Sequence, residues 1–408
     1  FFSSANKIAF QPVFHSGMQA EKGRNSHYSK SLTVLSKCLF CFRPNMEDLE
    51  KYSFTEEGEL RQKETCEAFV FNYYKDDYES NHLRYQALGH LITQHVYRVL
   101  EEKCNLQRVY IPVEAREQEP KSLFFMSPGA LDNPKGLIIL IQDRGAIRAG
   151  QWNIKVIASE GMEKGSQIPY IKKALGESSG VIVMNPNDNF LESFGECDTT
   201  TEYIRMSEKE ELINKCMKDK RFIPLAKRGS TTPEEHVQYI WDHFIANSSA
   251  NQIAVVAHGY GGLVFMDLLS QRSEQVQKKV YAVALIDSVH NMWHQVKDKE
   301  LQKWIQKHCR KWVLSSKPID RYTTFMKVDC PQVSAGTESR EYAPWSCIQS
   351  VFRFFGRILK GKTTHFSRDV IITRSKSEKK TTPPSKEQWT NRRLNRKTSG
   401  VGRSRTSC

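Results

Sequence analysis

Residues 253–265, Ile-Ala-Val-Val-Ala-His-Gly-Tyr-Gly-Gly-Leu-Val-Phe, decide the fold class of this 408-residue chain. An apolar run typical of a buried strand leads into a glycine-rich turn, and a helix-forming segment follows. Other segments indicate further strands: 109–113, 123–126, 136–141, 181–184, 280–286 and 325–333. Periodic apolar positions indicate helices between them: 81–104, 232–244, 263–270 and 346–359. The alternation predicts an α/β domain with a mostly parallel sheet and helices on both faces.

The glycine-rich turn matches two kinds of site unequally. Dinucleotide-binding folds require G-x-G-x-x-G, but Val264 stands at the third glycine position, where strand and helix must approach closely. The nucleophile elbow of α/β-hydrolases has G-x-S-x-G, because small residues permit the sharp turn. Gly259 stands at the nucleophile position, and glycine has no side chain to form an acyl-enzyme. The turn therefore favours an α/β-hydrolase-like fold that lacks the usual nucleophile.

Other candidate nucleophiles fit less well. Tyr260 is a poor nucleophile near neutral pH. A formal G-x-S-x-G occurs at 176–180, but it precedes a predicted strand, so we interpret it as coincidence. An active hydrolase would have to use Ser288 or a cysteine, and we expect none of these on a strand-to-helix turn with a base beside it.

Several stretches in one order along the chain carry a family resemblance, among them Ala68-Phe-Val-Phe-Asn72, Trp241-Asp-His-Phe-Ile-Ala246 and Asp287-Ser-Val-His-Asn291. They resemble the argonaute-binding-protein-two-like family, α/β-hydrolase-like proteins tied to argonaute and chromatin. The similarity covers about residues 60–355. The resemblance implies an α/β-hydrolase-like fold, partners among argonaute and chromatin-associated proteins, and a place in the nucleus and the cytoplasm.

The chain departs from that family at the positions that would carry catalysis. Gly259 replaces the elbow serine, and Gln142-Asp143-Arg144-Gly145 replaces the oxyanion loop His-Gly-Ser-Gly. A carboxylate at Asp143 would oppose a developing oxyanion. Arg340 replaces the base histidine, and arginine stays protonated. Only Asp287 remains in a plausible position for the acid of a triad.

The pattern predicts a scaffold without catalysis. Losing the nucleophile alone costs a triad hydrolase about a millionfold in rate. We expect the former pocket to be lined by His258, Tyr260, Gly261, Arg144 and His290, with His290 completing a turn rather than acting as a base. The expected function is a pseudo-hydrolase that binds protein partners. The alternatives are an esterase with an unconventional nucleophile and nucleic-acid binding through a basic tail.

The uneven distribution of positive charge along the chain helps to predict the domain organisation. Of the net charge of +14, residues 361–408 contribute +10, from thirteen Lys or Arg and three acids, and the other 360 residues contribute +4. This Ser/Thr-rich tail is predicted to be disordered. It could be a nuclear import signal, a nucleic-acid arm or a solubilising tail. We expect a poorly ordered segment at 1–46 and a domain at 47–360, with a polar insertion at 190–230.

Composition excludes other classes of protein. No apolar run reaches the ~18 residues that a membrane span needs, so we expect no membrane partner. The ten cysteines are scattered, which suits a reducing compartment. Cys38 and Cys41 form a C-x-x-C without a matching second pair, so the sequence predicts no metal and no cofactor.

Overall fold

The computed structural model describes residues 46–191, 225–296, 298–323 and 329–363. These residues belong to one compact unit that ends at Thr363. The predicted N-terminal segment except Met46, most of the polar insertion, the tail beyond residue 363 and the Cys38–Cys41 pair lie outside the described residues. Within them, no helix is both long and apolar enough to cross a membrane.

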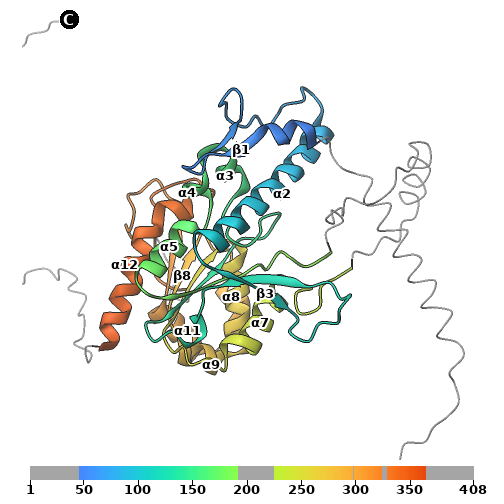
Figure 1. Cartoon of the computed structure of the whole chain (residues 1–408). Helices are drawn as coiled ribbons and strands as arrows, with labels where there is room; N and C mark the ends of the chain where they lie inside the picture. Colours follow the sequence, from blue (N-terminus) through green and yellow to red (C-terminus); the bar gives the residue numbers. More distant parts are fainter. Residues whose placement is uncertain (1–45, 192–224, 297, 324–328, 364–408) are drawn as a thin grey trace, which may run out of the picture. The chain divides into compact units, whose positions relative to one another are not determined.

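An eight-stranded sheet forms the centre of the unit, in the order β10-β9-β8-β7-β5-β6-β4-β3 (Figure 1). Five of the neighbouring pairs are parallel, and β4 runs antiparallel to both of its neighbours. The strands are β3 (Gln107–Ile111), β4 (Ser122–Met126), β5 (Leu137–Ile141), β6 (Gly180–Val183), β7 (Ile253–His258), β8 (Val280–Ile286), β9 (Cys309–Val313) and β10 (Gln332–Ser334). The predicted mostly parallel α/β architecture is confirmed.

The central strands are buried on both faces because helices cover each side of the sheet. Every residue of β5, β7 and β8 is buried. Alternate β5 residues enter different cores, Ile138 on one face and Ile139 on the other. One core packs against α2 (Tyr78–Glu102), α3 (Ile154–Glu160), α4 (Met162–Gly165), α5 (Ile168–Gly176) and α12 (Ala343–Thr363).

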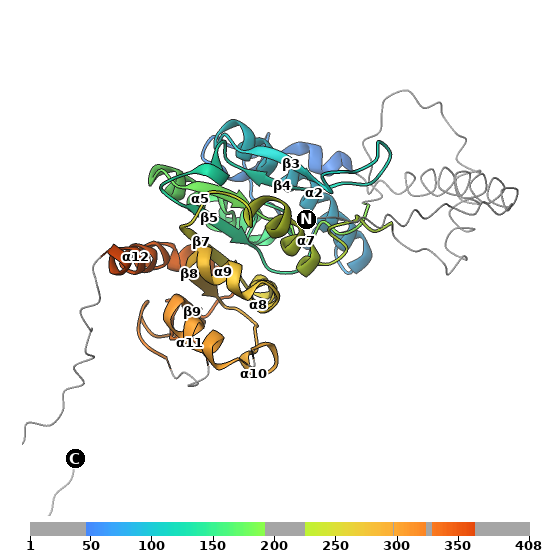
Figure 2. The same ribbon diagram turned by 90° about the horizontal axis from the view of Figure 1, so that it is seen from below.

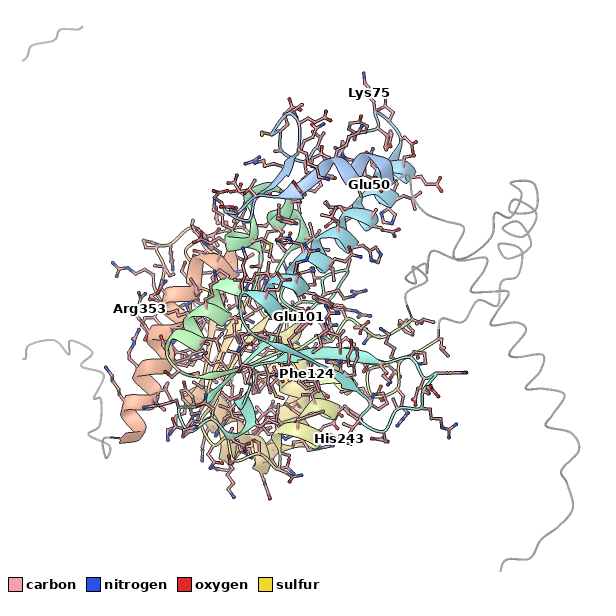
Figure 3. The ribbon with its side chains drawn as sticks, viewed as in Figure 1. Glu50, Lys75, Glu101, Phe124, His243 and Arg353 are labelled. Carbon is pink, nitrogen blue, oxygen red and sulfur yellow. The ribbon has the colours of Figure 1, made fainter. Side chains whose placement is uncertain are left out.

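The opposite core packs against a second group of helices (Figure 2). These are α7 (Pro233–Ile240), the π-helical turn η3 (Trp241–Ile245), α8 (Tyr260–Gln271), α9 (Ser273–Lys279), α10 (Met292–Gln295) and α11 (Lys299–His308). Phe124 of β4, labelled in Figure 3, belongs to this core. Its ring packs edge-on against that of Phe244. The two cores explain why the central strands are apolar at nearly every position, with His258 at the end of β7 as a polar exception.

Shorter elements complete the unit. An antiparallel hairpin, β1 (Tyr52–Phe54) and β2 (Leu60–Gln62), follows the 3-10 helix η1 (Met46–Lys51). A further 3-10 turn, η2 (Ala130–Asp132), lies between β4 and β5. At the start of α7, the Thr232 side chain accepts a hydrogen bond from the Glu235 N–H, and Pro233 is the first helical residue. This N-cap was predicted from the sequence and is confirmed.

Candidate functional site

The turn between β7 and α8 has the backbone of a nucleophile elbow. Gly259 joins the two elements with φ 55° and ψ −118°, a conformation that side-chain-bearing residues rarely adopt. Its N–H donates to the Ile286 carbonyl at 2.9 Å, and its own carbonyl accepts from the Val289 N–H at 3.1 Å. The end of β8 therefore holds the turn on both sides.

Two further glycines let α8 approach its neighbours. A Cβ atom on Gly261 would lie 2.6 Å from the Gln142 carbonyl oxygen, and one on Gly262 would lie 1.9 Å from Ser288 Oγ. Neither distance is possible for a real side chain. The run of small residues at the turn is therefore required by close packing, as an elbow requires.

The carboxylate of Asp143 occupies the space that a side chain at residue 259 would need. A Cβ atom on Gly259 would lie 2.2 to 2.4 Å from the three terminal atoms of Asp143. Asp143 reaches this place from the loop after β5, the strand paired with β7. Glycine at residue 259 and aspartate at residue 143 are thus spatially complementary.

Asp143 is held by backbone donors and by a cation. Its Oδ1 accepts the Tyr260 N–H at 2.7 Å and the Arg144 N–H at 2.8 Å. Its Oδ2 accepts from Arg340 Nη2 at 2.7 Å and from Nε at 3.2 Å. In α/β-hydrolases, the N–H of the residue after the nucleophile donates to the oxyanion. Here the Tyr260 N–H already binds a fixed carboxylate.

Arg340 connects two carboxylates that are far apart in sequence. Besides Asp143, its guanidinium approaches Asp287 Oδ2 at 3.4 Å. Burial would raise the pKa of Asp143, but the Tyr260 N–H, His258 and Arg340 lower it on balance. Burial raises the pKa of Asp287, and Arg340 only partly opposes that shift. Asp287, at the predicted acid position, therefore pairs with Arg340, at the predicted base position.

His258 and Gln142 lie side by side beneath the turn, at the ends of β7 and β5. Both are buried, and their polar side-chain atoms form no hydrogen bond within the described part of the chain. The indole of Trp152 stands edge-on to the His258 ring, with the centroids 5.8 Å apart. Burial lowers the pKa of His258 to about 4, although the charge of Asp143 opposes that shift. His258 is therefore neutral near pH 7.

Arg144 and Tyr260 extend away from the carboxylate network. The Arg144 guanidinium lies over the Tyr260 ring, 5.4 Å from its centroid. The Tyr260 hydroxyl donates to Glu234 Oε1 at 2.7 Å. The side chains that close the turn are therefore Asp143 and Arg340, with Arg144 stacked outside them.

His290 lies in a second polar group, which the sequence did not reveal. Ser288 Oγ and His290 Nδ1 are 2.7 Å apart, and His290 Nε2 and Asp329 Oδ1 are 3.1 Å apart. A base therefore does lie beside Ser288, in the loop between β8 and α10, and our expectation that no serine on a strand-to-helix turn would have one was wrong. Asp329 was missed because 39 residues separate it from His290 and no motif connects them.

This second group is closed to solvent. The His290 side chain is 0% exposed and that of Asp329 is 6% exposed. Ser288 is also buried, with its Oγ against Gly262. The group thus has the residue types of a catalytic triad. Its imidazole is reversed, because a triad serine bonds Nε2 and a triad aspartate bonds Nδ1.

Two surface cavities lie away from both groups. One, of about 560 Å³, lies between α5 and the start of α12 and includes Pro169 and Trp345 in its lining. The other, of about 300 Å³, lies between the β1–β2 hairpin, α2 and α5, and includes His95 and Lys172. Neither lining includes Gly259, Asp143 or Arg340.

Comparison with known proteins identifies the family. The Arb2 domain matches residues 42–319. The human "Putative protein ARB2BP" is 49% identical over 339 residues, 81% of this chain and 94% of that protein. The mouse "Cotranscriptional regulator ARB2A" is 43% identical over 408 residues, 91% of this chain and 97% of that protein.

Among solved structures, "A histone deacetylase from Saccharomyces cerevisiae" aligns with 66% of this chain and 97% of its own, at 15% identity and a TM-score of 0.41. The family match and the two close relatives confirm the resemblance predicted from the sequence. The chain belongs to the Arb2 domain family.

Proposed function

We propose that this chain is a pseudo-hydrolase of the Arb2 domain family, which acts by binding protein partners rather than by catalysis. One observation carries the proposal: the Asp143 carboxylate fills the space in front of Gly259 and accepts the Tyr260 N–H. A substrate carbonyl would need that space and that donor. A negative charge there opposes the negative charge of an oxyanion.

The other catalytic roles are absent from the same turn. Gly259 offers no hydroxyl or thiol for attack. Arg340, at the predicted base position, stays protonated and cannot accept a proton. Two carboxylates, Asp143 and Asp287, hold its guanidinium in place. The network stabilises the turn in a form that provides no nucleophile, no proton acceptor and no free oxyanion donor.

The names of the relatives support a regulatory role. Several, including the mouse protein and a second human relative that is 43% identical over 348 residues, are called cotranscriptional regulators. A regulator without catalysis acts through the proteins it binds. We propose partners among chromatin-associated factors and argonaute, and a place in the nucleus and the cytoplasm.

Labelling with a serine-directed fluorophosphonate tests the absence of catalysis. The unmodified full chain should remain unlabelled, and so should Gly259→Ser, because its new side chain meets Asp143. The triple variant Asp143→Gly, Gly259→Ser, Arg340→His frees the space and restores a base, so it should label slowly. Labelling of the unmodified chain would contradict the proposal.

Affinity purification tests the proposed partners. The full chain, tagged and expressed in cells, should bring down argonaute in an immunoblot of the eluate. The variant Asp143→Gly, Gly259→Ser should do so equally, since the proposal assigns binding to the scaffold. Absence of argonaute from eluates of both proteins would remove argonaute as a partner and would leave the other proteins of the eluate to be identified.

A second candidate function, an esterase with an unconventional nucleophile, rests on the bond between Ser288 and His290. The Ser288 hydroxyl would attack an ester carbonyl while His290 Nδ1 takes its proton. The ester C–O bond would then break, Nδ1 would return the proton to the departing alcohol, and water would cleave the acyl-enzyme to release the acid and the free serine. The burial of both residues opposes this candidate, because a substrate must reach Ser288 Oγ.

Ester hydrolysis by two variants decides between the functions. For the esterase, turnover of a p-nitrophenyl ester should survive Gly259→Ala and disappear with Ser288→Ala. For the pseudo-hydrolase, the full chain and both variants should match the uncatalysed rate.

We also propose that residues 361–408 attract nucleic acid through phosphate contacts. The support is their excess of ten positive charges. Phe366 and Trp389 are their only Phe, Tyr or Trp residues, which favours phosphate contacts over base stacking. Binding of a labelled duplex should weaken steeply with salt and be lost when residues 364–408 are deleted, which leaves α12 intact. Binding that persists after the deletion would contradict this proposal.

A further inference from the structure

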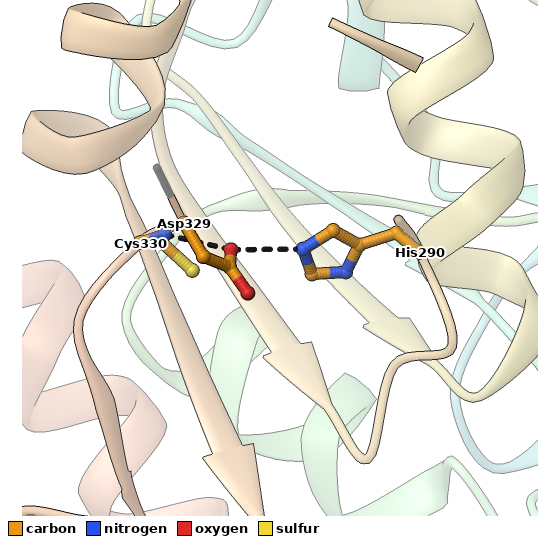
Figure 4. Close-up of side chains that lie close together, drawn as sticks. All are labelled: His290, Asp329 and Cys330. Atoms are coloured by element: carbon orange, nitrogen blue, oxygen red, sulfur yellow. Dashed lines mark hydrogen bonds and ion pairs between the residues drawn. The ribbon is translucent and has the colours of Figure 1, made fainter. Parts of the chain in front are cut away.

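Three side chains of types that can ligate a metal meet next to the opposite core, outside the elbow (Figure 4). His290 follows β8, while Asp329 and Cys330 precede β10. One ligand atom of each residue lies within 4.8 Å of the other two, and all three residues are buried. Two distant chain segments thus bring a nitrogen, an oxygen and a sulfur ligand together.

The residues around this group orient its ligand atoms. Ser288 Oγ lies 2.7 Å from His290 Nδ1, which leaves Nε2 directed at Asp329. The Asp329 carboxylate accepts the Cys330 N–H at 2.7 Å and the Gln332 amide at 3.1 Å. Metal-binding histidines and carboxylates are typically fixed by such outer hydrogen bonds. The group therefore has both the ligands and their supports.

The short contact between His290 Nε2 and Asp329 Oδ1 requires a proton or a metal ion between the two atoms. When Ser288 accepts the proton of Nδ1, Nε2 presents a lone pair to the Asp329 oxygen 3.1 Å away. These two acceptors attract only if a proton or a metal ion lies between them. In the alternative tautomer, Nε2 carries the proton and Ser288 donates to Nδ1.

A further cysteine lies on the neighbouring strand, outside the group of three whose ligand atoms lie within 4.8 Å of one another. In the parallel register of β10 and β9, Gln332 pairs with Lys311, so Cys330 falls opposite Cys309 two residues earlier. The Lys311 N–H donates to the Pro331 carbonyl at 3.0 Å, which continues this pairing before β10. Both cysteines are buried in the same core.

We propose that His290, Asp329 and Cys330 bind a zinc ion, with Cys309 as the fourth ligand. Imidazole, carboxylate and thiolate together suit zinc, whereas Mg²⁺ and Ca²⁺ require mainly oxygen ligands. Burial and four protein ligands are typical of a closed structural site. The ion joins the loop after β8 to the segment before β10.

Zinc binding and an esterase based on Ser288 exclude each other. With zinc on Nε2 and the Nδ1 proton directed at Ser288, the imidazole has no free nitrogen to accept the serine proton. The zinc site therefore goes beyond the proposed function and does not depend on it. An elbow without catalysis is compatible with both the presence and the absence of zinc.

Metal analysis of the purified full chain tests the site. After expression in zinc-supplemented medium and gel filtration, mass spectrometry should find about one zinc per chain, in line with a buried structural site. Cys330→Ala should lose the metal, while Cys104→Ala, a buried cysteine in the other core, should keep it. Wild-type protein without zinc, or equal zinc in both variants, would overturn the proposal.

Cobalt substitution keeps the test independent of whether a variant folds. Wild-type chain stripped of metal and loaded with Co²⁺ should show a thiolate-to-cobalt charge-transfer band, and absence of the band would overturn the thiolate ligand. Ser288→Ala should weaken zinc affinity about 10- to 100-fold. Unchanged affinity would show that Ser288 does not orient His290. Zinc retained unchanged in Cys309→Ala would exclude Cys309 as a ligand.

Discussion

Two glycines of the same turn, three residues apart, meet polar side chains of different kinds. The space at Gly259 is filled by Asp143, which belongs to a partly exposed network with Arg340 and Asp287. The space at Gly262 is filled by Ser288, which belongs to the sealed group with His290. The elbow side has the backbone of a nucleophile elbow, with glycine at residue 259. The other side has the residue types of a triad without access for a substrate.

The difference shows that catalytic residues and a catalytic site are separate properties. A serine, a histidine and an aspartate in hydrogen-bonding order do not make an enzyme unless a substrate reaches them. Conversely, a correctly bent turn offers no free oxyanion donor when a carboxylate already accepts its N–H, as Asp143 accepts that of Tyr260. The following variants test how much the contacts at Gly259 and at Gly262 each contribute to the stability of the fold.

The largest effect is expected at the elbow. Gly259→Ala should lower the free energy of unfolding by about 3 kcal/mol, since it combines backbone strain at φ 55° with overlap on Asp143. Adding Asp143→Gly should recover part of this loss in a double-mutant cycle measured by urea denaturation. Strictly additive losses would show that Asp143 does not fill this space.

On the sealed side, Gly262→Ala should lower the free energy of unfolding by about 2 kcal/mol, because the new methyl group overlaps Ser288. Gly356→Ala in α12 is the matched control, since a Cβ atom there meets no atom within 4 Å. The control should leave stability unchanged or raise it slightly. Equal losses in both variants would refute the close approach of α8 to Ser288.

Acid should destabilise the elbow side through His258. Its pKa is about 4 in the fold and about 6.5 when unfolded, so the unfolded chain gains a proton first as the pH falls. Stability should therefore fall between pH 6.5 and about 4, by about 2 kcal/mol at pH 5. Urea denaturation at pH 7 and pH 5 should show this difference shrinking in His258→Gln and persisting in His243→Gln, an exposed control. An unchanged difference in His258→Gln would place the acid sensitivity elsewhere.

The smallest effect is expected from the exposed cation. Arg340→Ala should cost about 1 kcal/mol in thermal or urea unfolding, because it leaves Asp143 and Asp287 without their shared partner. Arg353→Ala, whose guanidinium binds the single carboxylate of Asp320, is the control and should cost less. A larger loss in the control would contradict a shared role for Arg340.

Continuous apolar runs predicted the central strands well. Strand β8 has the bounds expected from the sequence, and β5 differs by one residue, because strands buried on both faces need apolar side chains throughout. Strand β9, Cys-Arg-Lys-Trp-Val, was missed, since its charged residues conceal a strand of which only Cys309 and Trp312 are buried. Helices α3, α4, α5, α9, α10 and α11 were also missed. The first five have nine residues or fewer, which is too short for a clear periodic signal, and α11 is short and strongly charged.

The elbow could be located from the sequence, but its closure could not. Small residues between a strand and a helix indicate a sharp turn wherever they occur. In contrast, the pairing of Asp143 with Arg340 joins residues 197 positions apart, and that of His290 with Asp329 joins residues 39 apart. The sequence shows which residues carry opposite charges, whereas only the folded structure shows which of them lie close enough to pair.

The overlap between residue 259 and Asp143 couples these two positions in any redesign of the turn. A side chain at residue 259 would collide with the Asp143 carboxylate, and removal of the Arg340 side chain would leave that carboxylate without its cation. Residue 143 must therefore be changed before a serine at residue 259 or a histidine at residue 340 can be accommodated. The order in which substitutions are introduced matters as much as their identity.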